Sequence, residues 1–143
     1  MGKYNLTEKK EKNAAYRSLV RAELVDELYE KILDIFVSKK KYRDPDYSAK
    51  KLAEELNTNT RYISAVVNIR FRQNYSSLVN EYRIKDAMYL LVDKRYMDKT
   101  MEEISAMVGF ANRQSFYAAF YKQEGMTPRT YRMNHLAKEN AKV

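Results

Sequence analysis

The feature that most constrains this chain is a repeat of its residue pattern at a fixed separation. Four pairs of residues of matching type lie 53 residues apart: Asn59 and Asn112, Ile63 and Phe116, Val67 and Phe120, Leu78 and Tyr131. The first pair consists of helix-capping residues, and the other three are large and apolar. Leu52 and Ile104 match at a separation of 52, so the second copy has one more residue in its break. A shared separation over this span predicts two copies of one structural unit.

The first copy has the pattern of a short helix, a polar break and a second helix. Ser48 is placed to cap a helix from about Ala49 to Leu56, in which Leu52, Ala53 and Leu56 face inward. After the break at residues 57–59, Asn59 caps a helix from Thr60 to about Arg70 that buries Ile63, Val66 and Val67. Two short helices joined by a tight turn form a helix-turn-helix.

The second copy repeats this arrangement with stronger capping signals. Thr100 caps a helix over residues 101–108, and Glu103 completes a capping box. After the break at residues 109–111, Asn112 caps a helix from Arg113 to about Gln123 that buries Phe116, Ala119 and Phe120. Thr127 and Pro128 then open a last helix, in which Tyr131 packs inward.

The rest of the chain is helical in pattern as well. Apolar residues recur every three or four positions over residues 13–39 and 76–92, and only three Gly and two Pro occur. We therefore expect an all-α fold, with two helix-turn-helix subdomains joined by a long linker helix and preceded by an extra N-terminal helix. The expected ranges are a disordered tail at 1–12, the N-terminal helix at 13–41, the first helix-turn-helix at 42–75, the linker helix at 76–93, and the second helix-turn-helix with its closing helix at 94–138.

Composition narrows the function classes. The net charge is +8, which favours a polyanionic partner such as nucleic acid. There is no cysteine and one histidine, His135, which excludes disulfides, zinc fingers and thiolate chemistry, and we expect neither a cofactor nor a metal. No nucleophile–base pair or Gly-rich phosphate loop is apparent, so we expect no catalytic residues and no enzyme. No apolar run spans a membrane, and a cytoplasmic location is expected.

The second helix of each copy has the side chains of a helix that reads bases in the major groove of double-stranded DNA. Opposite the buried residues, the first presents Thr60, Arg61, Ser64 and Ala65, and the second presents Arg113, Gln114, Tyr117 and Ala118. Arginine pairs with guanine and glutamine with adenine, so Arg61, Arg113 and Gln114 lead this set. We call these two helices the reader helices. Each arginine has a plainer interpretation as a solvated surface residue.

Positive charge gathers on the same segments. Phosphate contacts are predicted for the basic residues Arg70, Arg72, Lys122 and Arg129, and for the capped helix starts at Asn59, Asn112 and Thr127. The preceding helix of each copy is neutral or acidic, with Lys50, Lys51, Glu54 and Glu55 in the first and Glu102 and Glu103 in the second. The charge pattern therefore places phosphate near the reader helices.

Several motifs in residues 101–132 resemble one family. They are the Gly109–Phe110 break, the Phe116-x-x-x-Phe120 helix, and the run 125–128 followed by Tyr131–Arg132. This half resembles the signature of AraC/XylS-type bacterial transcription regulators, and residues 52–84 resemble the family's first unit, so that about residues 45–135 are covered. The resemblance implies a seven-helix DNA-binding domain whose reader helices enter neighbouring major grooves. It adds Ser115 to the base contacts and Tyr131, with Thr127 and Arg129, to the phosphate contacts.

The chain also departs from that family. Arg72 stands where the first unit usually has Gly, and Ala65 and Ala118 are smaller than the basic residues often found there. The leading helix and Tyr42-x-x-Pro45-Asp46 resemble a subset in which this domain closes a longer signalling chain, which implies an upstream sensor.

Other interpretations stay open at this point. The apolar face of the leading helix docks on the first unit or on the partner in a homodimer. Two other functions fit parts of the sequence: a non-specific nucleic-acid-binding or RNA-binding module, and a protein-interaction module that works through its N-terminal helix.

Overall fold

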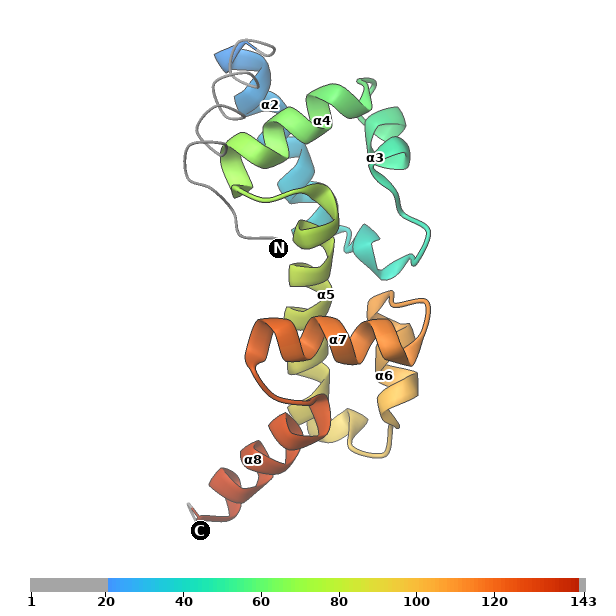
Figure 1. The fold of residues 1–143 in the computed structure, drawn as a ribbon, viewed down its shortest axis with the longest axis vertical. Coiled ribbons are helices and arrows are strands. Elements are labelled where there is room, and N and C mark those ends of the chain that lie inside the picture. Colours follow the sequence, from blue (N-terminus) through green and yellow to red (C-terminus); the bar gives the residue numbers. More distant parts are fainter. Residues whose placement is uncertain (1–20, 142–143) are drawn as a thin grey trace, which may run out of the picture. The chain divides into compact units, whose positions relative to one another are not determined.

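A computed structural model describes residues 21–141, and its regular elements in that range are helices (Figure 1). The predicted all-α class, with two helix-turn-helix subdomains, a linker helix and an extra N-terminal helix, is confirmed. The predicted tail and the predicted start of the N-terminal helix at residue 13 lie outside the described residues. Within them, one compact unit contains residues 21–40 and 47–78, and a second contains residues 41–46 and 79–141. We refer to them as the first and second units.

In the first unit, α2 (Ala22–Leu33) continues through a π-helical turn, Asp34–Ser38. Leu28, Ile32 and Phe36 point into the unit and are 2%, 0% and 0% exposed. Because these residues recur at intervals of four, they lie on one side of the helix, which packs against α4 (Thr60–Val66). The apolar face of α2 is therefore used within the chain, and a homodimer would need another surface.

The first helix-turn-helix consists of α3 (Ala49–Glu55) and α4, which pack against each other. The predicted caps are confirmed. Ser48 Oγ accepts the Lys51 N–H at 3.2 Å, and Asn59 Oδ1 accepts the Tyr62 N–H at 2.9 Å. The reader helix extends beyond α4 through a π-helical turn, Val67–Phe71, and then α5 (Tyr75–Val92) begins.

In the second unit, α6 (Met101–Val108), α7 (Arg113–Glu124) and α8 (Pro128–Ala141) follow a short 3₁₀ turn, Lys94–Tyr96. The capping box is present, with Glu103 N–H donating to Thr100 Oγ1 at 3.1 Å and Thr100 N–H donating to Glu103 Oε1 at 3.3 Å. Asn112 Oδ1 caps α7 at 2.8 Å from the Ser115 nitrogen. Thr127 Oγ1 caps α8 at 3.1 Å from the Thr130 nitrogen.

The core of the second unit is aromatic at its centre. Phe116 and Phe120 of α7 are fully buried, and their rings meet edge to face at 5.8 Å between centroids. Around them lie Ile84, Ala87, Leu91, Ile104 and Val108, all of them buried. The ring of Tyr131 on α8 packs on Phe120 at 5.8 Å, which confirms the inward orientation predicted for it.

The backbone extends the sequence repeat to the turns. Arg72 and Gly125, also 53 residues apart, both have left-handed backbone conformations, with φ of +57° and +73°. Asn57 and Gly109 do the same at a separation of 52, with φ of +55° and +109°. Each helix-turn-helix therefore has one left-handed residue after its first helix and another after its reader segment, and only the second unit places glycine there.

Candidate nucleic-acid interface

The first reader helix, α4, exposes most of the side chains predicted to read bases. Thr60, Arg61 and Ser64 are exposed. Ala65 is not, because it is 0% exposed, and the prediction that it faces DNA is wrong. The sequence pattern predicts one buried face for α4, but both α2 and α3 pack against this helix. A helix covered from two directions buries residues on more than one side.

The second reader helix, α7, exposes the residues expected of it. Arg113, Gln114, Ser115 and Ala118 are exposed, and Tyr117 is half-buried. Because of the helical spacing, these side chains point in other directions than those of Phe116 and Phe120, which lie in the core. The buried rings therefore hold the orientation of the helix while the polar face stays accessible.

Arg113 is held in place by its neighbours. Its Nη1 lies 3.8 Å from Glu102 Oε1 on α6, and its Nη2 donates to the Tyr117 hydroxyl at 3.3 Å. Its guanidinium also lies over the Tyr117 ring, 4.8 Å from the centroid. Because Arg113 and Glu102 are both exposed, their ion pair contributes little to stability. A guanine or phosphate oxygen would compete with this weak ion pair and with the Tyr117 hydroxyl.

A groove of about 490 Å³ lies beside the second reader helix. Its lining comes from the start of α6 and from α7 and α8, and consists of Lys99, Thr100, Met101, Glu102, Arg113, Tyr117, Arg129, Arg132 and Met133. Four of these side chains are cationic and one is acidic. The excess of positive charge therefore suits the groove to an anionic ligand.

Most residues predicted to contact phosphate lie at the surface. Asn59, Arg72, Asn112, Lys122 and Arg129 are exposed, and Thr127 and Tyr131 are half-buried. The Asn59 and Asn112 side-chain oxygens are already used as helix caps. Each amide NH2 group keeps its donor hydrogens.

Arg70 has partners within the first unit. Its guanidinium forms an ion pair with Asp26 of α2 and lies over the Tyr29 ring at 4.8 Å. A phosphate would have to displace the Asp26 carboxylate. These contacts join the end of the reader segment to α2, a link that the sequence pattern does not indicate.

Arg132 has a structural role that sequence reasoning missed. Its guanidinium donates to three backbone carbonyls, those of Leu91 at 2.8 Å, Tyr96 at 3.3 Å and Lys99 at 3.3 Å. Burial lowers the pKa of this guanidinium below its ordinary value. Arg132 joins α8 to the end of α5 and to the turn that follows it.

The described residues offer no other obvious chemistry. Within residues 21–141, no three His, Asp or Glu side chains gather closely enough to hold a metal ion. None of the helices in that range is long and apolar enough to cross a membrane. His135 lies 3.4 Å from Glu139 on the exposed part of α8.

A family model described as a helix-turn-helix domain matches residues 52–134, which is more than half of the chain. This chain belongs to the AraC-type helix-turn-helix family. The family and the fold are those of DNA-binding transcription regulators. The family match contains both reader helices and ends inside α8, in agreement with the resemblance carried by the sequence motifs.

Two kinds of relatives accompany the family match. An uncharacterized HTH-type transcriptional regulator, YtdP of Bacillus subtilis, is 30% identical over 81 residues, which cover 57% of this chain and 10% of YtdP. The chain thus matches about a tenth of that relative's length.

Among solved structures, the C-terminal domain of the two-component response regulator yesN of Fusobacterium nucleatum is 25% identical. It covers 73% of this chain and 98% of its own, with a TM-score of 0.63. The C-terminal domain of AraT, a response regulator of Geobacillus stearothermophilus, is similar in fold at 24% identity and a TM-score of 0.64, covering 77% of this chain and 84% of its own.

Proposed function

We propose that this chain is the DNA-binding output part of a longer transcription regulator and that it reads double-stranded DNA through α4 and α7. The observation that carries the proposal is the pair of reader helices. Each begins at an asparagine cap, each is fixed by fully buried side chains, and each exposes a polar and basic face. Such a face on the second helix of a helix-turn-helix fits the major groove.

The base contacts divide between the two helices. Thr60, Arg61 and Ser64 would read bases from α4. From α7 the readers would be Arg113, Gln114, Ser115, Tyr117 and Ala118. The arginines supply paired donors for guanine O6 and N7, and Gln114 matches adenine N6 and N7. The methyl group of Ala118 fits against a thymine methyl group.

Phosphate contacts would supply most of the affinity. Lys122 and Arg129 carry exposed charge near the second reader helix, and Arg72 does so at the end of the first. The starts of α4, α7 and α8, at Asn59, Asn112 and Thr127, add backbone N–H donors and the positive ends of helix dipoles. Tyr131 would donate its hydroxyl, and Arg70 would take part only after leaving Asp26.

The longer protein is supported by the comparisons. YtdP is far longer than the matched segment, and the two solved relatives are C-terminal domains of response regulators. We infer that an upstream sensor precedes this chain and that a homodimer is one of its working forms. We also infer that it acts in the cytoplasm, where bacterial DNA is found. Its role is binding without a catalytic step or a cofactor.

The test is selection of bound sites from random duplexes, followed by competition. Excess of the selected duplex should displace the labelled site at far lower concentration than excess random duplex, and binding should weaken steeply as salt rises. Equal displacement by both competitors would favour the alternative of a non-specific module and would overturn sequence reading.

The alternative of a protein-interaction module that works through the N-terminal helix has less support. Ile32 and Phe36 are fully buried inside the first unit, so the apolar face of α2 is not presented to a partner. Deletion of the residues up to Lys40 would expose that core and would therefore not test the alternative cleanly. Replacement of Val37, which is 56% exposed, leaves the core intact and is the better test.

A further inference from the structure

Residues 41–46, which we call the strap, connect the two units in an unexpected way. The strap follows α2 and its π-helical turn and precedes α3, both of which belong to the first unit, yet it packs within the second unit. It begins with a single 3₁₀ turn, Lys41–Arg43, that contacts α6. The family match starts at residue 52, so the strap lies outside it.

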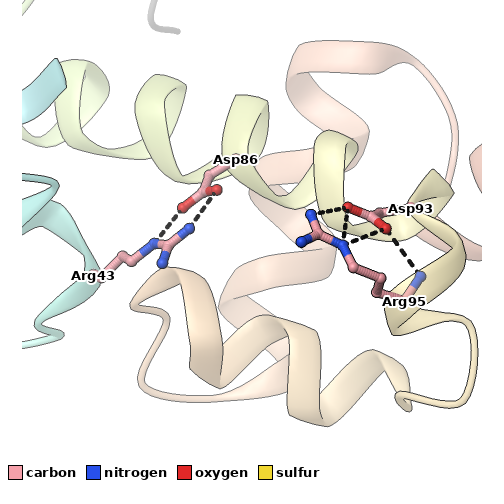
Figure 2. Close-up of polar contacts among 4 residues, drawn as sticks. All are labelled: Arg43, Asp86, Asp93 and Arg95. Carbon is pink, nitrogen blue, oxygen red and sulfur yellow. Dashed lines mark hydrogen bonds and ion pairs between the residues drawn. The ribbon is translucent and has the colours of Figure 1, made fainter. Parts of the chain in front are cut away.

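The strap is fixed to α5 by a nearly buried carboxylate. Arg43 donates to both oxygens of Asp86, with its Nε at 2.7 Å and its Nη2 at 2.9 Å (Figure 2). The Tyr42 hydroxyl donates to the same carboxylate at 3.0 Å. The Asp86 side chain is only 7% exposed. Two parallel charge-assisted bonds fix direction as well as distance. Burial and the Asp86 charge raise the pKa of Tyr42 well above its ordinary value, so its hydroxyl keeps its proton.

Arg83 makes a second attachment, one turn earlier on α5. Its Nε donates to the Tyr42 carbonyl at 2.8 Å and its Nη2 to the Asp44 carbonyl at 3.1 Å. The same guanidinium lies over the Phe110 ring, 5.6 Å from the centroid. Arg83 therefore contacts both the strap and the turn of the second helix-turn-helix.

The strap also meets that turn directly. A Cβ atom at Gly109 would lie 2.2 Å from the Tyr42 carbonyl oxygen, so only glycine permits this close approach. Phe110, the next residue, packs its ring on Phe116 of α7 at 5.4 Å between centroids. The position of the strap therefore affects Phe110, and through it Phe116, the core residue that orients the second reader helix.

We propose that the strap is a positioning element for the second reader helix and that it transmits displacement of the end of α2 to DNA reading by α7. The inference rests on the proposed function of α7. Arg43 and Asp86 do not contact DNA in this scheme and act through Gly109 and Phe110. A conformational change upstream of α2 would thereby alter the position of the second reader helix without involving the first reader helix.

The test compares two arginines of the second unit that each pair with an aspartate. Arg43→Gln removes the ion pair between the strap and Asp86, while Arg95→Gln breaks an exposed local pair with Asp93 and removes the same charge (Figure 2). Both variants of the full chain are titrated with the selected duplex, with random duplex and with mismatched duplexes. The mismatches lie at the base positions where Arg61→Ala loses preference, which belong to the first reader helix, and where Arg113→Ala does, which belong to the second. Hydrogen exchange of the Gly109 and Phe110 amides is measured on the same samples.

Relative to Arg95→Gln, we expect Arg43→Gln to bind the selected duplex about five-fold more weakly, the low end of losing one bidentate base contact. Binding of random duplex should match the control. Discrimination at the Arg113 positions should fall, while discrimination at the Arg61 positions should be unchanged. Exchange of the Gly109 and Phe110 amides should accelerate. Arg43→Lys should fall between the wild type and Arg43→Gln because an ammonium cannot pair bidentately.

The inference would be overturned if Arg43→Gln behaved like Arg95→Gln in every titration, or if it lost discrimination equally at both sets of positions. Unchanged amide exchange at Gly109 and Phe110 would also overturn it. Failure of the proposed function is distinguishable, because the wild type itself would then show no preference among duplexes. The exchange measurement would still report whether the strap holds the turn.

Discussion

Arg72 offers a test in which stability and DNA binding should change in opposite directions. Its φ is +57°, and its counterpart in the second unit, at the same place in the repeat, is Gly125 with φ of +73°. A left-handed conformation costs a residue with a Cβ about 1–2 kcal/mol. Glycine in turn lowers the free energy of unfolding by about 0.5–1 kcal/mol, because it has greater conformational freedom in the unfolded chain. We therefore expect Arg72→Gly to raise the free energy of unfolding by about 0.5–1 kcal/mol.

The matched variants are Arg72→Ala and Gly125→Ala. Arg72→Ala removes the same side chain but keeps the Cβ, so it should not be stabilised. Gly125→Ala should lose about 0.5–1 kcal/mol, and purely through conformation, because nothing lies within 4 Å of the added Cβ. Urea unfolding followed by circular dichroism measures all three variants. If Arg72→Gly were no more stable than Arg72→Ala, the argument from backbone strain would be refuted.

The same Arg72 variants test the predicted phosphate contact. Loss of one contact should reduce the slope of log affinity against log salt concentration by about 0.9, equally for selected and random duplex. Arg72→Gly and Arg72→Ala should share this change, since both remove the charge. An unchanged slope in both would remove Arg72 from the phosphate contacts while leaving the stability prediction intact.

Three further predictions concern the second unit. Arg113→Ala should weaken binding of the selected duplex by about 1–3 kcal/mol and relax preference at one base position, measured by titration of mismatched duplexes; a uniform loss across all sequences would mean that Arg113 contacts phosphate only. Arg132→Met should lower the free energy of unfolding by about 2 kcal/mol, because three carbonyls lose a charged donor, while base preference stays unchanged; a change of preference would contradict the structural role. The hydrogen bond from the Thr100 backbone lowers the pKa of Glu103 from 4.5, so its stabilisation is full above that value and is lost as the pH falls through the folded-state pKa. Urea titrations at several pH values should show a shallower acid-side decline for Glu103→Gln than for the wild type, and identical declines would count against the capping box in solution.

The local organisation of this protein could be predicted from its sequence. The caps at Asn59, Thr100 and Asn112 and the buried pairs of the repeat follow from residue type and spacing over a few positions. Helix caps and amphipathic periodicity are local properties, because their partners lie within about one turn of the same helix. The same local signals predicted which helices expose a polar face, but they failed at Ala65.

Non-local contacts decided the rest. Periodicity tells which face of a helix is apolar, but it does not tell how many neighbours the helix has, and so α2 and α3 together buried Ala65. A charged side chain in the sequence gives no sign of its partner. Arg132 lies 41 residues from Leu91, and Arg43 lies 43 residues from Asp86. The sequence alone therefore determined the helices, their caps and the two reader faces. The tertiary structure decided which arginines remain available to DNA and which hold the fold, because a guanidinium goes to the carboxylate or carbonyl that packing brings within hydrogen-bonding distance.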